Sequence, residues 1–390
     1  MVSQETLQFL QQHWDDDPSQ LLFAQQRYPL VDMAFVAQQI EGRRQALEKY
    51  PTLAECPDFV YPPRLNREQS SSEATARYKS ALVGDGTLAD LTGGMGVDLI
   101  FAAERCEKAV YIEQNEMLCE NMRHNSKALQ LDNVECQCGD SMAWIESSNL
   151  NFDTLFIDPA RRDGQGRRVS AFEDCTPDIT KNLVMLLSRC KKLVVKASPM
   201  ISIDAALAQL QSVDEVHIVA VKGECKEVVF VCSRDSGNRP SIVCADICAN
   251  KTLVERFEYG EEAAAEPMYC SELHKYLYEP NATLMKSGYF ASLGNRYGLE
   301  MLGRNTHLYS AEQRVDGFPG RVFEILERLP LNAKSVMKAV PKRKAHVVCR
   351  NYKISASALQ QQLRIKEGGD LFIIATTFQQ KPIGLLCRRV

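Results

Sequence analysis

The middle of the chain alternates between short apolar runs and longer segments whose apolar residues recur at helical spacing. The apolar runs cover residues 88–91, 109–113, 134–138, 154–158 and 192–197. The helical patterns cover residues 99–104, 117–129, 179–187 and 205–210. Strands that alternate with helices in this way predict an α/β fold with a doubly wound sheet, in which right-handed crossovers keep the strands parallel.

Apolar patterns on both sides of this region predict further elements. Two runs, 216–221 and 227–232, are too close for a helix between them, so we predict an antiparallel pair at the edge of the sheet. Residues 1–66 read as helices, and residues 320–390 read as strand, helix, strand, helix and two strands, which predicts a small α+β domain. Residues 237–319 mix strand-like pieces with Tyr- and Gly-rich turns.

A glycine-rich turn lies where the first predicted strand meets the first predicted helix. It runs from Asp90 to Gly96 with the sequence DLTGGMG. Glycine permits positive φ and a close approach of the backbone to a ligand, and the start of a helix presents unpaired N–H groups. Because open α/β sheets bind ligands at the carboxyl ends of their strands, the turn predicts a site for a nucleotide-like cofactor.

Four acidic residues fall at or just after the ends of predicted strands. Asp90 ends the first strand, and Asp158 ends the fourth, where it would face the reacting end of a cofactor. Glu113 ends the second strand, where a carboxylate can accept two hydrogen bonds from the hydroxyl groups of a ribose. Asp140 follows the third strand and could contact an adenine amino group. Four acids in this register predict one nucleoside-binding edge.

The spacing of the glycines decides which cofactor fits. The turn lacks the G-x-G-x-x-G spacing that cradles a pyrophosphate, so a dinucleotide-dependent hydride transfer is the weaker alternative. S-adenosylmethionine (SAM) contains ribose and adenine but no phosphate. Its ammonium and carboxylate groups suit the region of Asp90 and the glycines. We therefore predict SAM as the cofactor.

Charge is distributed unevenly along the chain. Residues 321–390 contain 14 Lys and Arg against 4 Asp and Glu, a net charge of +10, which leaves −14 for residues 1–320. The cations gather around Tyr352 at Lys334, Lys338, Lys342, Arg343, Lys344, Arg350 and Lys353. Such a cluster predicts contact with the phosphate backbone of a nucleic acid, and the alternative is a solvated basic face without a partner.

Other sequence features exclude several classes of protein. The 14 cysteines include no Cys-x-x-Cys pair and no Cys/His cluster at zinc spacing, so we predict no metal site. No apolar run has the length of a membrane span, and the N-terminus lacks the features of a signal peptide. We therefore expect a soluble cytoplasmic protein, whose oligomeric state stays open.

Several longer motifs resemble a known family. In residues 68–232 they are EQSSSEATARYK from Glu68, DLTGGMG from Asp90, the acid Glu113, DPARR from Asp158 and KASPM from Lys196. In the tail they are YEPN at 278–281, FPGR at 318–321 and GGD at 368–370. The chain resembles the bacterial class I SAM-dependent methyltransferases with a ferredoxin-like insert and a C-terminal THUMP-like domain.

The resemblance implies four domains and an RNA substrate. Residues 1–66 form a helical domain, 67–236 the Rossmann-like methyltransferase domain, 237–319 a ferredoxin-like α+β domain and 320–390 a THUMP-like basic domain. The implied catalytic residues are Asp158, Pro159 and Arg161. The implied cofactor-binding residues are Asp90, Thr92, Gly93, Gly94, Gly96, Glu113, Gln114, Asp140, Ser141 and Asp158.

The segment from Asp158 to Arg161 departs from amino-methylating relatives, which have Asn/Asp-Pro-Pro-Tyr/Phe here. It has no aromatic residue at its fourth position, which argues against methylation of an exocyclic amine. Carbon-5 methylation needs a cysteine nucleophile, and none follows the fourth or fifth strand. Asp158 remains the candidate base, while Arg161 and Arg162 could stack on a base, clamp a phosphate or form ion pairs with nearby acids. Lys196 and Ser198 would line the pocket, although a structural role explains Lys196 equally well.

Two alternatives stay open beside an RNA methyltransferase. One is a methyltransferase of a protein or small molecule, and the other is an inactive RNA-binding scaffold. The role of the three serines before Glu73 is also open, because they predict either a capping box for the next helix or a set of hydroxyl groups beside a cofactor.

Overall fold

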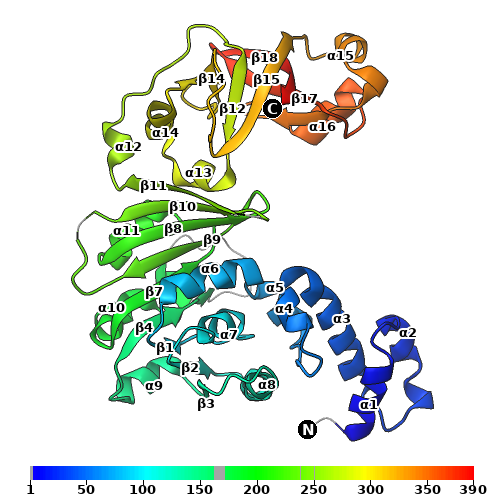
Figure 1. Ribbon diagram of the computed structural model, residues 1–390, viewed down its shortest axis with the longest axis vertical. Helices are drawn as coiled ribbons and strands as arrows, with labels where there is room; N and C mark the ends of the chain where they lie inside the picture. The colour runs from blue at the N-terminus through cyan, green and yellow to red at the C-terminus, as the bar shows by residue number, and fades with distance from the viewer. Residues whose placement is uncertain (1–2, 162–171, 238, 250) are drawn as a thin grey trace. The chain divides into compact units, whose positions relative to one another are not determined.

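The computed structural model describes residues 3–161, 172–237, 239–249 and 251–390, and the chain divides into two compact units. Unit 1 contains residues 1–216 and 226–238, and unit 2 contains residues 217–225 and 239–390. Figure 1 shows the helices and strands of both units.

Unit 1 begins with helices, as the apolar spacing predicts. They are α1 (Gln4–Gln12), α2 (Pro18–Phe23), the 3-10 turn η1 (Gln25–Arg27), α3 (Met33–Lys49), α4 (Pro51–Ala54) and α5 (Arg64–Gln69). Asp32 begins α3 by accepting a hydrogen bond from the N–H of Phe35 (3.0 Å). The proline-containing segment after α4 is irregular but well anchored, because the side chain of Asn125 hydrogen-bonds both the N–H and the C=O of Val60 (2.8 and 3.0 Å).

A parallel sheet forms the centre of unit 1. Its strands are β1 (Thr87–Asp90), β2 (Lys108–Glu113), β3 (Val134–Cys138), β4 (Phe152–Ile157) and β7 (Cys190–Ala197), in the order β7-β4-β1-β2-β3. The helices around it are α6 (Glu73–Val83), α7 (Val97–Ala103), α8 (Glu116–Ala128), α9 (Ser141–Ser147), α10 (Ile179–Ser188) and α11 (Ile203–Leu210). Figure 1 shows α7 and α8 on one side of the strands and α9 and α10 on the other. The predicted α/β, doubly wound fold class is confirmed.

The predicted antiparallel pair is present as β8 (Val213–Val221) and β9 (Glu224–Cys232). β9 runs antiparallel to β7, with Val195 opposite Phe230. In the strand order, β10 (Ser241–Ile247) and β11 (Thr252–Glu258) follow β8, so the antiparallel part of the sheet is larger than the sequence pattern indicates. The short strands β5 (Ala160–Arg161) and β6 (Cys175–Thr176) form a separate pair, and the turn η2 (Phe172–Asp174) precedes β6.

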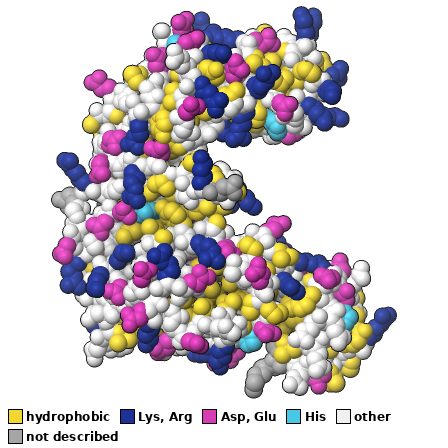
Figure 2. Space-filling model, viewed as in Figure 1, with side chains coloured by type: hydrophobic (Ala, Val, Ile, Leu, Met, Phe, Trp, Pro, Cys, Tyr) yellow, Lys and Arg dark blue, Asp and Glu magenta, His cyan; other side chains and the backbone are white. Residues whose placement is uncertain are grey.

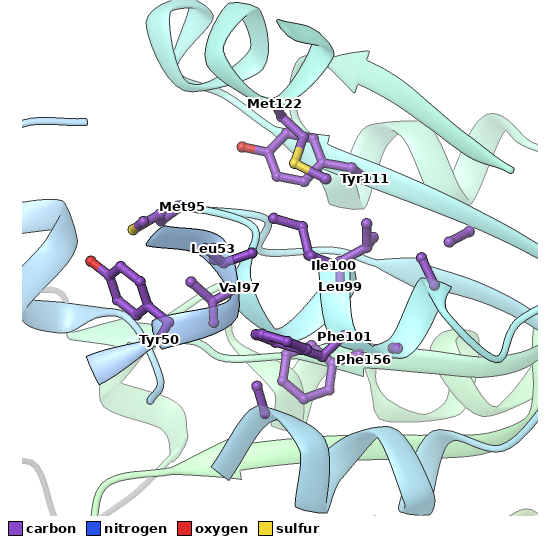
Figure 3. Close-up of a cluster of buried hydrophobic side chains, with 14 of the residues drawn as sticks. Tyr50, Leu53, Met95, Val97, Leu99, Ile100, Phe101, Tyr111, Met122 and Phe156 are labelled. Atoms are coloured by element: carbon purple, nitrogen blue, oxygen red, sulfur yellow. The ribbon is translucent and has the colours of Figure 1, made fainter. Parts of the chain in front are cut away.

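One apolar core joins the sheet to the end of the N-terminal helical region. Figure 3 shows Tyr50 and Leu53 among Met95, Val97 and Ile100, which belong to the glycine-rich turn and α7. All five side chains are buried. Burying residues of this size stabilises the fold by about 1.5–3 kcal/mol each, so the start of α7 is held firmly against its neighbours.

Unit 2 contains a second, mostly antiparallel sheet in the order β13-β14-β12-β15-β18-β17-β16. Its strands are β12 (Tyr276–Pro280), β13 (Glu300–Met301), β14 (Tyr309–Ala311), β15 (Gly320–Arg328), β16 (His346–Cys349), β17 (Leu371–Phe378) and β18 (Lys381–Arg389). Its helices are α12 (Glu261–Ala264), α13 (Ala282–Ser287), α14 (Phe290–Tyr297), α15 (Ala333–Ala339) and α16 (Ala356–Leu363), with the turn η3 (Pro341–Arg343). The predicted succession of elements after residue 320 is confirmed.

Candidate active site

Acidic side chains lie at the carboxyl edge of the parallel sheet in unit 1. Asp90 ends β1, Glu113 ends β2 and Asp158 directly follows β4, while Asp140 begins α9 after β3. Because the strand order is β4-β1-β2-β3, the acids follow one another along this edge as Asp158, Asp90, Glu113 and Asp140. This is the edge at which open α/β sheets bind their ligands.

The glycine-rich turn packs on the ring of Tyr111. The N–H of Gly93 donates to the carbonyl of Ile112 (2.9 Å), and a Cβ at Gly93 would lie 2.2 Å from Cε2 of Tyr111. The Tyr111 hydroxyl donates to the carbonyl of Gly94 (2.6 Å). Gly96 begins α7 with a φ of +82° and lies against Met122. Figure 3 shows Tyr111 and Met122 next to each other. A larger residue at Gly93 or Gly96 would displace the turn.

Glu113 connects the turn to the second strand. Its Oε2 accepts a hydrogen bond from the N–H of Gly94 (2.9 Å), and its Oε1 accepts one from the N–H of Asn115 (2.9 Å). A carboxylate offers about four acceptor positions, so two remain for hydroxyl donors of a ligand.

Gln114, Asp140 and Ser141 lie next to this position. The amide of Gln114 donates to Oδ2 of Asp140 (2.8 Å), whose Oδ1 accepts from the N–H of Ala143 and caps α9 (2.7 Å). Ser141 is the buried first residue of α9. The structure therefore brings Asp140 and Gln114 together and gives Asp140 a capping role that strand-end spacing does not indicate.

Thr92 connects the ends of the first and fourth strands. Its N–H donates to Oδ1 of Asp90 (3.0 Å), and its hydroxyl accepts a hydrogen bond from the N–H of Asp158 (2.6 Å). Burial raises the pKa of Asp90 to about 8, which the hydrogen bond from Thr92 only partly opposes. A buried carboxyl group with this environment favours a positively charged ligand, whose charge would stabilise the carboxylate.

Asp158 forms an ion pair with Lys196, which projects from β7. Nζ of Lys196 donates to Oδ2 of Asp158 (2.5 Å). The Lys196 side chain is 12% exposed and that of Asp158 is 37% exposed. Burial by itself lowers the pKa of Lys196, but Asp158, Asp98 and Glu227 raise it above its usual range. Lys196 therefore stays an ammonium group at the edge of the site.

A second lysine, Lys79, lies behind this pair and is 1% exposed. Its Nζ contacts the carboxylate of Glu227, Oδ1 of Asp98 (3.1 Å) and the hydroxyl of Ser71 (3.2 Å). The Ser71 hydroxyl in turn donates to Oδ2 of Asp98 (2.7 Å). Burial raises the pKa of Asp98, but Lys79 and Lys196 outweigh this effect and lower it overall. We call Lys79, Asp98, Glu227 and Ser71 the buried charge cluster.

Sequence reasoning assigned no role to Lys79, Asp98 or Glu227. Lys79 stands on the buried face of α6, where its neighbours in the helical pattern are Ala76 and Val83. Glu227 is the first of six consecutive buried residues in β9, and the other five are apolar. A charged residue at a core position is the signal that could have identified both, because such residues are rarely buried unless they are paired.

The serines before α6 include the N-cap of this helix, and a role of their hydroxyls beside a cofactor stays a prediction. Ser72 is the N-cap, and its side chain accepts from the N–H of Thr75 (3.3 Å). Glu73 does not complete a capping box, because its carboxylate accepts from the N–H and hydroxyl of Thr52 (2.9 and 2.6 Å). Ser71 contributes its hydroxyl to the buried charge cluster.

The remaining predicted catalytic positions follow Asp158. Pro159 is half-buried, and Arg161 belongs to β5, whose backbone pairs with Cys175. The side chain of Arg161 and all of Arg162 lie outside the described residues, so their predicted roles stay predictions. Ser198 follows β7, where its Oγ accepts from the N–H of Met200 (3.3 Å).

Unit 2 contains a basic groove between β16 and α16. It has a volume of about 730 Å³ and includes Arg321, Arg350, Tyr352 and Lys353 in its lining. The guanidinium groups of Arg321 and Arg350 both contact the buried carboxylate of Glu279, which fixes their positions. Figure 2 shows further Lys and Arg side chains on the surface formed by α15 and α16.

The described residues include no group of three His, Cys, Asp or Glu side chains that could hold a metal ion. No helix in the described part of the chain has the length and apolar character needed to cross a membrane.

A solved structure that matches the whole chain is found among known proteins. A protein from Porphyromonas gingivalis W83, whose crystal structure is described as that of a "putative methyltransferase", is 31% identical and matches over 100% of both chains with a TM-score of 0.91. An rRNA methylase from Streptococcus thermophilus matches 41% of this chain and 94% of its own, at 12% identity and a TM-score of 0.30.

Two family models match parts of unit 2. Residues 276–319 match a ferredoxin-like domain, and residues 320–389 match a THUMP domain-like family. No curated protein matches the chain.

Proposed function

This chain belongs to the family of the Porphyromonas gingivalis protein, and its residues 276–319 and 320–389 match ferredoxin-like and THUMP-like domains. On this premise we propose that the chain is a SAM-dependent methyltransferase that modifies RNA. The observation that supports SAM best is the order of the acids along the sheet edge. In this order, Asp140 would contact the adenine of SAM and Glu113 its ribose. Asp90 would lie near the ammonium group of the methionine part, and Asp158 near the methyl acceptor.

The residues at this edge fit the chemistry of SAM. Glu113 retains two acceptor positions for the ribose hydroxyls, and Asp90 is a buried carboxyl group suited to a cationic ligand. Gly94 has a φ of +54°, and a Cβ there would meet only the carbonyl oxygen of Thr92, at 3.8 Å, so its backbone can approach the methionine part of the ligand. When bound, SAM supplies an electrophilic methyl group on a sulfonium.

Replacing Glu113 with glutamine is expected to weaken SAM binding about 10- to 100-fold, because one charged acceptor becomes a donor and the bond from Gly94 or Asn115 is lost. Isothermal titration with SAM measures this change. Glu135→Gln is the matched control, since Glu135 is an exposed acid of β3 paired with Lys108, and it should leave the affinity unchanged. Folded wild-type protein that does not bind SAM would contradict the proposal.

The RNA substrate is supported by unit 2. The THUMP domain-like match covers the part of the chain with the excess of Lys and Arg, and this part contains the basic groove. Arg350 and Arg321 are held in place by Glu279, whereas Lys353 is exposed and free to reach a phosphate. Positioned guanidinium groups suit phosphate recognition.

Replacing Lys353 with alanine is expected to lower the affinity for bulk tRNA and to reduce the slope of log K against log salt by about 1, as for the loss of one phosphate contact. Fluorescence anisotropy over a salt series measures both quantities. Lys251→Ala removes an exposed lysine outside the groove and should change neither. A wild-type affinity independent of salt would argue against backbone contact.

The acceptor end of the site contains Asp158 and Lys196 rather than a thiol. Cys175, which β6 brings beside β5, is buried at 7% exposure, whereas a nucleophilic cysteine needs access to its substrate. We therefore propose direct transfer of the methyl group, in which Asp158 removes a proton from the acceptor.

The function as a whole is tested by incubating the protein with tritiated SAM and total RNA from cells that lack the gene. Label in RNA supports the proposed function, and mass spectrometry of the nucleosides then identifies the product. Label that appears only in protein or small molecules would show that the substrate is not RNA. If the protein binds SAM but transfers no methyl group, the alternative of an inactive RNA-binding scaffold would be favoured.

A further inference from the structure

The two lysines of the site differ in how their donors are used. Lys79 donates hydrogen bonds to Glu227 and Ser71 and also forms an ion pair with Asp98, whose Oδ1 lies 3.1 Å from Nζ. Among the described residues, Lys196 donates one hydrogen bond, to Asp158, and its nearest other carboxylate oxygen is that of Asp98 at 4.0 Å. Lys196 therefore keeps donors for a substrate, beside the residue proposed to take the proton.

The ammonium group of Lys196 beside Asp158 affects amine and hydroxyl acceptors of the methyl group in opposite ways. When a neutral amine attacks a methyl group, positive charge develops on its nitrogen, and a nearby ammonium opposes this. When a hydroxyl attacks, its oxygen must lose a proton, and a nearby ammonium stabilises the negative charge that develops. The pair of Lys196 and Asp158 thus suits a hydroxyl acceptor and disfavours an amine.

The sequence around Asp158 agrees with this distinction. Amino-methylating relatives have an aromatic residue in the fourth position of the motif, whereas this chain has Arg161 there, whose guanidinium could stack on a base or clamp a backbone phosphate. A sugar hydroxyl needs no such stacking partner. Within an RNA chain, the 2′-hydroxyl is the free hydroxyl of each internal nucleotide.

We propose that the methyl acceptor is a ribose 2′-hydroxyl of RNA, with Lys196 donating to the acceptor oxygen and Asp158 accepting its proton. This inference rests on the proposed function and names its substrate group. In the transfer, the bond from the methyl carbon to sulfur breaks and the bond from the methyl carbon to O2′ forms. The sulfonium becomes a neutral thioether, and the hydroxyl proton passes to the carboxylate of Asp158 and then to water.

The buried charge cluster positions this pair. Lys79 neutralises Asp98 and Glu227, which would otherwise attract Lys196 away from Asp158. With Lys79 in place, Lys196 stays beside Asp158, where its side chain is at the border between protein and solvent. Lys79, Glu227 and Asp98 are therefore positioning residues, and Lys196 and Asp158 are the catalytic pair.

The decisive experiment uses wild-type protein, tritiated SAM and total RNA from cells that lack the gene, followed by complete alkaline hydrolysis. Alkaline cleavage requires a free 2′-hydroxyl, so a 2′-O-methyl group leaves an uncut dinucleotide. We expect the label in dinucleotides. Label in mononucleotides would show base methylation and overturn this inference while leaving the proposed function intact. No transfer to RNA by SAM-binding protein would overturn the proposed function itself.

A variant supplies a second readout. Lys196→Met is expected to lower kcat about 10²- to 10⁴-fold while SAM affinity, measured by titration, changes less than about threefold. Lys196→Arg keeps the positive charge and should recover part of the rate. Lys191→Met, an exposed lysine at the other end of β7, is the matched control and should have wild-type kcat. Wild-type kcat in a folded Lys196→Met variant would overturn the role of Lys196.

Discussion

Replacing Lys79 with methionine is expected to lower the free energy of unfolding by about 3–5 kcal/mol. The substitution keeps the volume of the side chain but leaves Asp98 and Glu227 buried without their shared cation. Removing one partner from a buried ion pair costs more than the pair itself contributes, because the remaining charge stays desolvated. Urea denaturation of the wild type and the variant measures the difference.

Two further variants test whether the loss of stability comes from the buried charge cluster. Lys108→Met removes a half-exposed ion pair with Glu135 and should cost less than about 1 kcal/mol. Adding Glu227→Gln to Lys79→Met removes one of the two uncompensated carboxylates, so the double variant should recover part of the lost stability. A Lys79→Met variant as stable as Lys108→Met would show that the cluster does not stabilise the fold.

Replacing Asp90 with asparagine is expected to stabilise the protein without its cofactor at alkaline pH while weakening SAM binding more than 10-fold. Asp90 has a pKa raised to about 8 in the folded protein, against about 4 in an unfolded chain. The protonated Asp90 contributes fully to the free energy of unfolding below its pKa in the unfolded chain. This contribution is lost as the pH rises to about 8, by at most about 1.4 kcal/mol per pH unit. Asparagine does not titrate, so the advantage of the variant should grow over this range and then stay constant.

Proton release gives an independent measurement of the same group. A cationic ligand beside Asp90 favours the carboxylate, so SAM binding near pH 7 should release a proton from the wild type. Titration in buffers of different ionisation enthalpy detects that proton, and Asp90→Asn should release none. Asp98→Asn is the contrasting control, since the pKa of Asp98 is lowered by Lys79 and Lys196 and its loss should destabilise the protein at alkaline pH. Equal behaviour of the two variants would argue against the distinct role of Asp90.

The elements of unit 1 were predictable because apolar spacing is a local property. Each predicted strand from 88–91 to 192–197 corresponds to an observed strand, with differences only at its ends. α9 was missed, since Ser141 and Ile145 are its buried residues and one large apolar side chain gives no periodic signal. In unit 2, β10 and β11 were expected only as strand-like pieces without bounds, because their region shows no clear alternating pattern.

The sequence by itself determined the doubly wound sheet and the presence of acids at its carboxyl edge, because both depend on short-range spacing and on the general topology of α/β folds. The tertiary structure decided which of these acids are paired. Lys79 and Glu227 are 148 residues apart in the chain, and Lys196 and Asp158 are 38 apart, yet each pair forms a direct contact. Ion pairing depends on distance in space and on burial, so only the packed structure shows that Asp98 and Glu227 share Lys79, that Lys196 pairs with Asp158, and that Asp90 forms no ion pair with another described residue.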